Sequence, residues 1–277
     1  MLTINCKGQL ISFEVPLVMG IINVTPDSFF SGSRHLINKE ILSTAEKMLT
    51  DGASFLDLGG QSTRPGSDRI TIDVELKRVI PAIESIIKNF PQAIISIDTY
   101  YAKVAEYAIN AGAAIVNDVS AGTIDEDLIS TVAALNVPYV LMHMQGDLQT
   151  MQKAPVYKNV VVEVFDALNF KIKELLNAGI KDIIIDPGFG FGKTTQHNFQ
   201  LLAQLNFFQQ LNKPLLIGLS RKGMVYKTLN STAEKALNGT TTLNTIALMG
   251  GANILRVHDV KEAVEAITLF TEIKKEM

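Results

Sequence analysis

Polar and charged side chains stand at the ends of the short apolar runs in this sequence. If those runs are parallel strands, their carboxyl ends share one face of the sheet, where binding sites are built. Acid and amide groups there can hydrogen-bond a heterocycle, and cations can bind an anion. We therefore predict a shared polar pocket at that face. The residues at or just past the run ends are Asn23, Asp57, Asp98, Asn117, Asp118, His143, Asp186, Ser220, Arg256 and His258.

Cationic and hydroxyl donors follow three different runs. Donors that converge from several strand ends suit a multiply charged anion such as phosphate or diphosphate. Because acids also end the runs, the pocket has both charge signs and suits a ligand with an anionic tail and a hydrogen-bonding ring. The three groups are Thr63 with Arg64, Arg221 with Lys222, and Arg256 with His258.

Helix capping is the alternative explanation for single members of this set. Asp favours the N-cap position, so Asp98 and Asp259 are each candidates to begin the helical segment that follows them. Capping does not explain why eight successive runs all end in polar groups. A common pocket is therefore the preferred interpretation.

Three local patterns that would indicate other chemistry fail on spacing. The segment 186–194, DPGFGFGKT, resembles a phosphate-binding G-x-x-x-x-G-K-[ST] loop, but Pro187 stands where the first glycine belongs. Its glycines instead predict a close approach by a ligand ring or another backbone. His143 has no second histidine or cysteine at zinc-ligand spacing, so we expect a packed or hydrogen-bonding histidine there. Ser220 lies outside the G-x-S-x-G pattern of a nucleophile.

The elements that must position the pocket are eight apolar runs with helical segments between them. Short runs rich in Ile, Val and Leu are typical of strands buried on both faces of a parallel sheet. Each strand and helix take about 33 residues, the size of a TIM-barrel unit. We predict a single TIM (β/α)8 barrel of the α/β class, with an open doubly wound sheet as the alternative. The predicted strands are 17–23, 54–59, 93–98, 113–118, 138–143, 182–186, 214–220 and 253–258.

Two further features complete the expected architecture. Residues 1–16 are predicted to form a short N-terminal β-hairpin around Lys7-Gly8-Gln9, and residues 17–277 a single barrel domain. Four helix-to-strand joints contain a glycine, which adopts the left-handed conformation past a helix end at little cost. These joints are 51–58, 111–118, 177–186 and 250–258.

Composition narrows the class of protein. The chain has 277 residues, 47% of them hydrophobic, so it can bury a large core and is not disordered. A net charge of −3 leaves no basic excess for nucleic acid. No apolar run approaches the roughly 18 residues of a membrane helix. Cys6 is the only cysteine, which excludes an internal disulfide. We predict a cytoplasmic protein without nucleic-acid or membrane partners.

Eight strings of the sequence, in order and at matching spacing, resemble those of the bacterial dihydropteroate synthases. They are MGIINVTPDSF, DLGGQSTRPGS, SIDT, VNDVSAG, MHMQG, IDPGFGFGK, GLSRKG and RVHDV, and they extend from Met19 to Val260. The resemblance implies a TIM-barrel transferase of folate biosynthesis. Its substrates would be (7,8-dihydropterin-6-yl)methyl diphosphate and 4-aminobenzoate, and its products 7,8-dihydropteroate and diphosphate. It further implies Mg2+ as cofactor and a homodimer.

The resemblance also implies roles for matching positions. The pterin would be held by Asp98, Asn117, Asp186 and Lys222, and Asn23 would help to bind Mg2+ and, through it, the diphosphate. The implied catalytic residues are Asp98, Lys222 and Arg256.

The remaining implied contacts concern the other two ligand groups. The implied diphosphate contacts are Thr63, Arg256 and His258. The implied aminobenzoate contacts are Arg64, Phe191 and Ser220, with the stem of Lys222. Mg2+, arginine and histidine would stabilise the departing diphosphate, and carboxylates would stabilise cationic character in the ring. An aromatic amine is a neutral nucleophile at pH 7, so this chemistry needs no strong base.

Two stretches depart from the family pattern. Phe30-Ser31-Gly32-Ser33 replaces the usual Ser-Asp-Gly-Gly, and Gln61 stands where glutamate is usual. Each change removes an acid near the site, so it bears on loop closure and metal contacts rather than on the pterin pocket.

Two other functions are compatible with a pterin pocket. A methyltransferase barrel that works with a cobalamin protein needs no diphosphate site, so the RVHDV and STRPG strings argue against it. A noncatalytic pterin-binding or partner-binding subunit would not need Asn23, Lys222 and Arg256, all of which are present.

Overall fold

Ten strands make up a hairpin and a barrel in the computed structural model, which describes residues 1–25, 34–62, 67, 69–151 and 153–276. Strands β1 (Thr3–Cys6) and β2 (Gln9–Ser12) pair antiparallel, with Thr3 opposite Ser12. The other eight form one parallel sheet in the order β8-β7-β6-β5-β4-β3-β10-β9. They are β3 (Leu17–Asn23), β4 (Phe55–Gly59), β5 (Ile95–Asp98), β6 (Ile115–Asp118), β7 (Tyr139–Met142), β8 (Ile183–Asp186), β9 (Leu216–Ile217) and β10 (Ile254–Val257).

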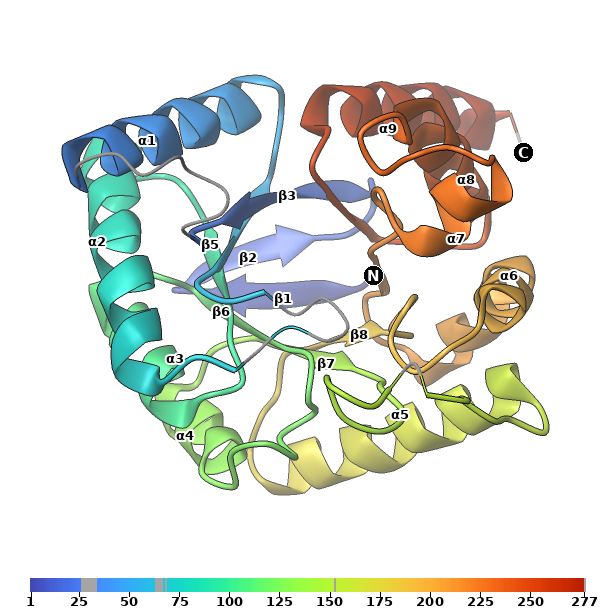
Figure 1. Cartoon of the computed structure of the whole chain (residues 1–277), viewed down its shortest axis with the longest axis horizontal. Helices are drawn as coiled ribbons and strands as arrows, with labels where there is room; N and C mark the ends of the chain where they lie inside the picture. The colour runs from blue at the N-terminus through green and yellow to red at the C-terminus, as the bar shows by residue number, and fades with distance from the viewer. Residues whose placement is uncertain (26–33, 63–66, 68, 152, 277) are drawn as a thin grey trace.

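The sheet curls into a barrel with helices around it (Figure 1). A parallel bridge between Ile185 and Leu215 joins the two ends of the sheet, β8 and β9, which excludes the open-sheet alternative. The described helices are α1 (Arg34–Thr50), α2 (Ile72–Asn89), α3 (Ala102–Ala111), α4 (Leu128–Leu135), α5 (Val160–Asn177), α6 (Thr195–Ala203), α7 (Gly223–Thr228), α8 (Leu237–Met249), α9 (Val260–Lys275) and the 3-10 helix η1 (Leu205–Leu211).

The predicted glycine joints between helices and strands are confirmed. Gly52, Gly112, Gly179 and Gly251 all have φ between 94° and 125°. Only glycine adopts these angles without a steric penalty, so each helix can turn sharply into the next strand.

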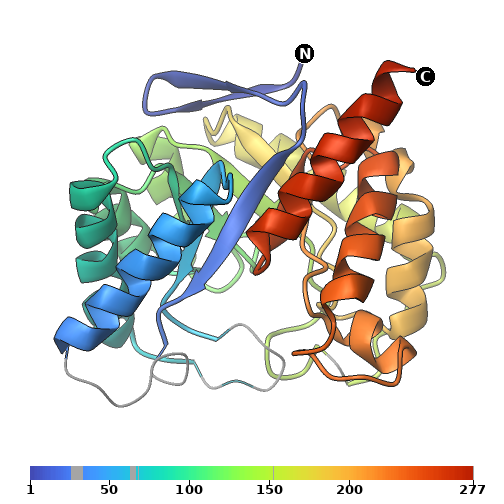
Figure 2. The same ribbon diagram turned by 90° about the horizontal axis from the view of Figure 1, so that it is seen from above.

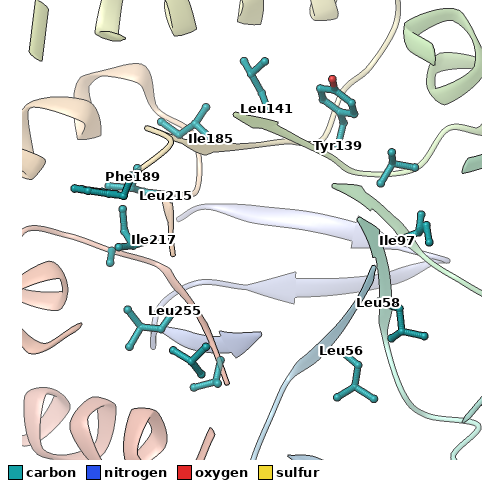
Figure 3. Packing of buried hydrophobic residues seen from close by; sticks show 14 of the residues in the cluster. Leu56, Leu58, Ile97, Tyr139, Leu141, Ile185, Phe189, Leu215, Ile217 and Leu255 are labelled. Carbon is teal, nitrogen blue, oxygen red and sulfur yellow. The ribbon is translucent and has the colours of Figure 1, made fainter. Parts of the chain in front are cut away.

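Alternation along the strands decides which side chains reach the barrel interior. Leu56, Leu58 and Ile97 point outward and pack under the helices (Figure 3). Successive side chains of a strand point to opposite faces, so Asp57 and Asp98 point inward. The same alternation places Asn117, Asp186 and Arg256 inside, next to the outward Val116, Ile185 and Leu255.

The hairpin closes one end of the barrel. Ile4, Cys6 and Phe13 pack against a second apolar cluster that includes Met19 and Phe55, which come early in their strands. Figure 2 shows the hairpin beside both termini, at the end of the barrel where β3 begins. This apolar plug leaves the opposite end, where the strands finish, as the place for polar side chains.

One predicted strand is much shorter than expected. The run 214–220 forms only β9, Leu216–Ile217, because the chain then turns at Ser220–Lys222 into α7.

Among the described residues, no helix is both long enough and apolar enough to cross a membrane.

Candidate active site

Three predicted polar residues stand side by side at the strand ends. The strand register pairs Asn23 with Gly59, Gly59 with Asp98, and Asp98 with Asn117. Neighbouring strands lie about 4.8 Å apart, so this row crosses four strands at one level. Because alternate positions point inward, the side chains of the row face the same space inside the barrel mouth.

An ion-pair network joins Arg256 to two acids of this space. Its Nε and Nη2 donate to the Asp57 Oδ2 at 2.6 and 2.5 Å, and its Nη2 also donates to the Asp98 Oδ2 at 2.8 Å. Asn117 Nδ2 donates to the same Asp57 oxygen at 3.1 Å. The predicted anion-binding arginine and two predicted pterin ligands therefore belong to one hydrogen-bonded unit.

Asp57 is the functional residue whose role the sequence left unassigned. Its side chain is fully buried, and it connects Arg256 to Asn117. The Oδ1 atoms of Asp57 and Asp98 are buried and have no hydrogen-bond partner within the described residues. Buried acceptors are normally paired, so these two oxygens are suited to N–H donors from a ligand.

Burial controls the protonation of the acids around Arg256. It raises the pKa of Asp98 to about 7, against the opposing effect of the Arg256 charge, and the negative charge of Asp57 adds to the rise. Burial likewise raises the pKa of Asp186, with the Lys222 charge acting against it. Acids with such pKa values can accept from a ligand or share its proton.

Lys222 and Asp186 lie on the far side of the space and are linked by the 187–193 loop. The Lys222 ammonium donates to the Phe189 carbonyl and lies 4.8 Å from the centre of the Phe191 ring. Asp186 Oδ1 accepts from Gly188 N at 2.7 Å. Burial lowers the pKa of Lys222 to about 8, with the Asp186 charge acting against this shift. The predicted pterin lysine and aminobenzoate phenylalanine are thus in contact.

Ser220 and His258 lie together at the ends of neighbouring strands. The Ser220 Oγ is 2.9 Å from His258 Nδ1 and accepts from the His258 backbone N at 3.2 Å. Next to them, Arg221 makes a two-pronged ion pair with Asp259, with Nη2–Oδ1 at 2.6 Å and Nε–Oδ2 at 3.1 Å. Arg221 is therefore paired with Asp259, and its contribution to an anion site stays a prediction.

The capping alternative fails for both acids to which it applied. Helix α3 has Tyr101 as its N-cap residue rather than Asp98. Asp259 stands at the N-cap of α9, but its side chain makes no cap hydrogen bond and instead pairs with Arg221.

Two members of the predicted pocket point away from it. Asp118 follows Asn117 and so points outward, where it accepts from the Ser120 and Gly122 backbones at 2.7 and 2.6 Å and from the Tyr139 hydroxyl at 2.6 Å. His143 points toward the buried ammonium of Lys193, with Nδ1 and Nζ 3.0 Å apart. Including Asp118 in a shared pocket was therefore wrong, whereas His143 is a hydrogen-bonded histidine, as its spacing indicated. Both residues stabilise loops.

Gln61 links the base of the second loop to the barrel. Its Nε2 donates to Glu75 Oε2 at 3.2 Å, and its Oε1 accepts from the Tyr100 hydroxyl at 2.6 Å. All three side chains are buried. Burial raises the pKa of Glu75 to about 8. Thr63 and Arg64, which follow Gln61, and Phe30-Ser31-Gly32-Ser33 lie outside the described residues.

The donor set for Mg2+ can be tested against the ion's chemistry. The described residues contain no cluster of three or more His, Cys, Asp or Glu side chains that could form an all-protein metal cage. Mg2+ commonly takes only one or two oxygen ligands from a protein and completes its shell with water and substrate phosphate. The amide of Asn23, at the mouth of the barrel beside Gly59 and Asp98, fits that mode.

Comparison with known proteins gives a consistent result. Residues 19–258 match the model of the family described as pterin binding enzyme. The dihydropteroate synthase of Escherichia coli strain K12 is 42% identical over 263 residues, which cover 94% of this chain and 93% of that protein.

Solved structures agree closely. A Yersinia pestis dihydropteroate synthase in complex with a sulfonamide drug superposes with a TM-score of 0.93 at 38% identity, over 100% of both chains. A Xanthomonas albilineans dihydropteroate synthase with 4-aminobenzoic acid gives a TM-score of 0.91 at 39% identity, over 98% of both chains.

Proposed function

Because this chain belongs to the pterin binding enzyme family, we propose that its barrel mouth is the active site of a dihydropteroate synthase. The reaction joins (7,8-dihydropterin-6-yl)methyl diphosphate to 4-aminobenzoate. One observation carries the assignment to this pocket: inward acids and an amide at the strand ends share a hydrogen-bonded unit with Arg256. That unit combines ring recognition with an anion-binding cation.

The acids and the amide recognise the pterin. A carboxylate accepts two parallel N–H bonds from an amidine-like edge, and an amide both donates and accepts. Asp186 has one oxygen on Gly188 N, and its inward position directs the other toward the space shared with Lys222. Asp98 and Asn117 complete the set, and the unpaired buried oxygens of Asp57 and Asp98 supply acceptors.

The cationic side stabilises the leaving diphosphate. Arg256 presents its guanidinium at the pocket, and His258 follows two residues later on the same side of the chain. Thr63 would add a hydroxyl. Asn23 is the residue that would hold Mg2+, which when bound neutralises charge on the phosphate oxygens. The ion pairs to Asp57 and Asp98 hold the Arg256 side chain ready for the anion at little further cost in conformational freedom.

The third group of residues holds the amine. Phe191, Ser220 and the stem of Lys222 form a wall against which an aromatic carboxylate can lie, and Arg64 would meet its charge. The amine nitrogen attacks the methylene carbon while the bond from that carbon to the diphosphate oxygen breaks. Diphosphate leaves with the bonding electrons, and the nitrogen then loses a proton. The acids Asp98 and Asp186 stabilise positive charge that develops in the pterin ring.

Two other functions make different demands on this pocket. A pterin-dependent methyltransferase has no diphosphate to bind, so it has no use for an arginine held by two acids in the pocket. A noncatalytic binding subunit has no use for both a partly buried lysine and a partly buried arginine beside the ring site. These features favour the synthase.

A homodimer is part of the proposal. Helices α8 and α9 pack together and present aliphatic side chains that are 45% to 67% exposed, which a second copy of the chain would cover. These side chains are Ile246, Met249, Leu269 and Ile273. Light scattering of the purified protein tests this, because Leu269→Glu should shift a dimer to monomer.

A cytoplasmic location is likewise proposed, and cell fractionation tests it.

The assay of function has three arms. Purified protein is mixed with the pterin diphosphate, Mg2+ and 4-aminobenzoate, and 7,8-dihydropteroate is measured by chromatography. A second arm replaces the diphosphate with a methyl-donating folate and a cobalamin protein, and a third measures pterin binding alone. The proposal predicts product in the first arm. Methyl transfer, or pterin binding without product, would favour the corresponding alternative.

A further inference from the structure

The segment Pro187–Lys193 is the loop that follows β8, and it packs against residues 143–145, which follow β7. Gly188 and Gly192 have φ of 72° and 60°, and a Cβ at either would collide with the backbone carbonyl of His143 or Gln145. The glycines are therefore required by a close approach of two backbones, as the sequence predicted. The lysine that made the segment resemble a phosphate-binding loop needs a different explanation.

Lys193 is buried inside this contact. Its side chain is 2% exposed, and its Nζ is within hydrogen-bond distance of four acceptors. They are Gly188 O at 2.9 Å, Phe191 O at 3.0 Å, His143 O at 3.2 Å and His143 Nδ1 at 3.0 Å. An ammonium has three donors, so the site is saturated by protein. Lys193 thus has no capacity left for a ligand.

Burial and the neighbouring charges change the pKa values of both groups in this contact. Burial, followed by the charge of Lys193, lowers the pKa of His143 to about 3, so its ring is neutral and can accept at Nδ1. Burial lowers the pKa of Lys193 to about 7, while the charge of Asp186 acts in the opposite direction. Lys222 is the other charged group that acts on Lys193.

The loop that Lys193 ties down carries contacts made inside the pocket. Asp186 accepts from the loop at Gly188 N. Lys222 donates to the Phe189 carbonyl, and its ammonium lies over the Phe191 ring. Two of the four Lys193 acceptors, Gly188 O and Phe191 O, are in this same stretch. Displacing the 187–193 loop would therefore move Lys222 and Phe191 together.

We propose that Lys193 is a positioning residue, which locks the 187–193 loop to the end of β7 and so fixes Phe191 and Lys222 for aminobenzoate and pterin. This rests on the proposed function, which assigns those ligands to the two side chains. Lys193 touches neither substrate. It acts through the loop and leaves the diphosphate side of the pocket, Arg256 and His258, unchanged.

The test is Lys193→Met, which keeps the length and apolar stem and removes all three donors. The KM for 4-aminobenzoate is expected to rise about tenfold or more, the effect of losing one charge-assisted hydrogen bond. Inhibition by inorganic diphosphate is expected to stay within about twofold of wild type. An unchanged aminobenzoate KM would overturn the proposal, and so would an equal loss at both sites.

The control must separate positioning from general destabilisation. Leu175→Ala removes a buried side chain in the last turn of α5 and lowers thermal stability without touching the loop. If Leu175→Ala lowers the melting temperature as much as Lys193→Met does, it should still leave the aminobenzoate KM unchanged. If the aminobenzoate KM rises equally in both variants, Lys193 only stabilises the fold and does not position the loop.

A second variant keeps the test decisive if Lys193→Met does not fold. Lys193→Gln retains two N–H donors, and it should raise the aminobenzoate KM by less than the methionine variant does. Wild-type KM in a folded Lys193→Gln variant would contradict the proposal. Absence of dihydropteroate synthesis by the wild-type protein is a separate result, which would contradict the proposed function before any variant is compared.

Discussion

Replacing Asp57 with asparagine removes the charge that joins Arg256 to Asn117. The Asp57 Oδ2 accepts from Arg256 Nε at 2.6 Å and from Asn117 Nδ2 at 3.1 Å, in a fully buried position. Asparagine keeps an oxygen that can accept one of these bonds but carries no charge. Arg256 then retains Asp98 as its only ionic partner within the described residues, at 2.8 Å.

The expected loss follows from the kind of bond that is weakened. A hydrogen bond to a charged group contributes about 1.5–3 kcal/mol. If that energy positions Arg256 for the leaving diphosphate, kcat/KM for the pterin diphosphate should fall about 10- to 150-fold. The pKa of Asp98 should also fall, because the Asp57 charge raises it in the wild type. The decrease in kcat/KM at low pH that reflects protonation of Asp98 should therefore begin at a lower pH.

The assay compares steady-state kinetics across pH with those of Asp118→Asn. Asp118 is an equally buried strand-end acid, but its partners are Ser120, Gly122 and Tyr139. Asp118→Asn should lower the melting temperature and leave kcat/KM within about threefold of wild type. If Asp57→Asn keeps wild-type kcat/KM, or if both variants lose activity in parallel with stability, Asp57 does not position Arg256.

Three further results are expected. Asp186→Ala should weaken pterin binding by about 2–4 kcal/mol, because ligand donors lose a charged partner; calorimetry that gave near-normal affinity would argue against this role. Arg256→Ala should reduce turnover of the diphosphate substrate more than binding of a pterin without that tail, and equal losses would point to a structural arginine. Burial raises the folded-state pKa of Glu75 from 4.5 to about 8. Between these two pH values the folded state keeps a proton that the unfolded state has lost, so the free energy of unfolding falls as the pH rises. The slope is at most about 1.4 kcal/mol per pH unit. Glu75→Gln should flatten this dependence in urea denaturation at pH 5 and pH 8, and an unaltered slope would exclude Glu75 as its source.

The sequence predicted the barrel because its evidence was local and repeated. Seven of the eight apolar runs end near the observed strand end, and the joints at Gly52, Gly112, Gly179 and Gly251 have the positive φ that the glycines indicated. The run 214–220 was the exception, since only Leu216–Ile217 pair before the chain turns into α7.

For the site, the sequence did not predict which strand-end side chains point into the barrel and which point outward. Asn117 and Asp118 are adjacent and both polar, and only the strand register shows that the first points inward and the second outward. Asp57 was among the polar residues near the run ends, but nothing local indicated that it would meet Arg256, which is 199 positions away. The partners of Lys193 include His143, 50 positions away, which no spacing rule connects to it. The roles of Thr63 and Arg64 remain predictions.

The most direct test of the central claim is the stoichiometry of the reaction. Wild-type protein and Arg256→Ala are incubated with the pterin diphosphate, Mg2+ and 4-aminobenzoate, and dihydropteroate and released diphosphate are measured in the same samples. We expect wild type to form both at equal rates, one for one, and Arg256→Ala to slow both together. Diphosphate release without dihydropteroate, or no release at all by folded wild-type protein, would contradict it.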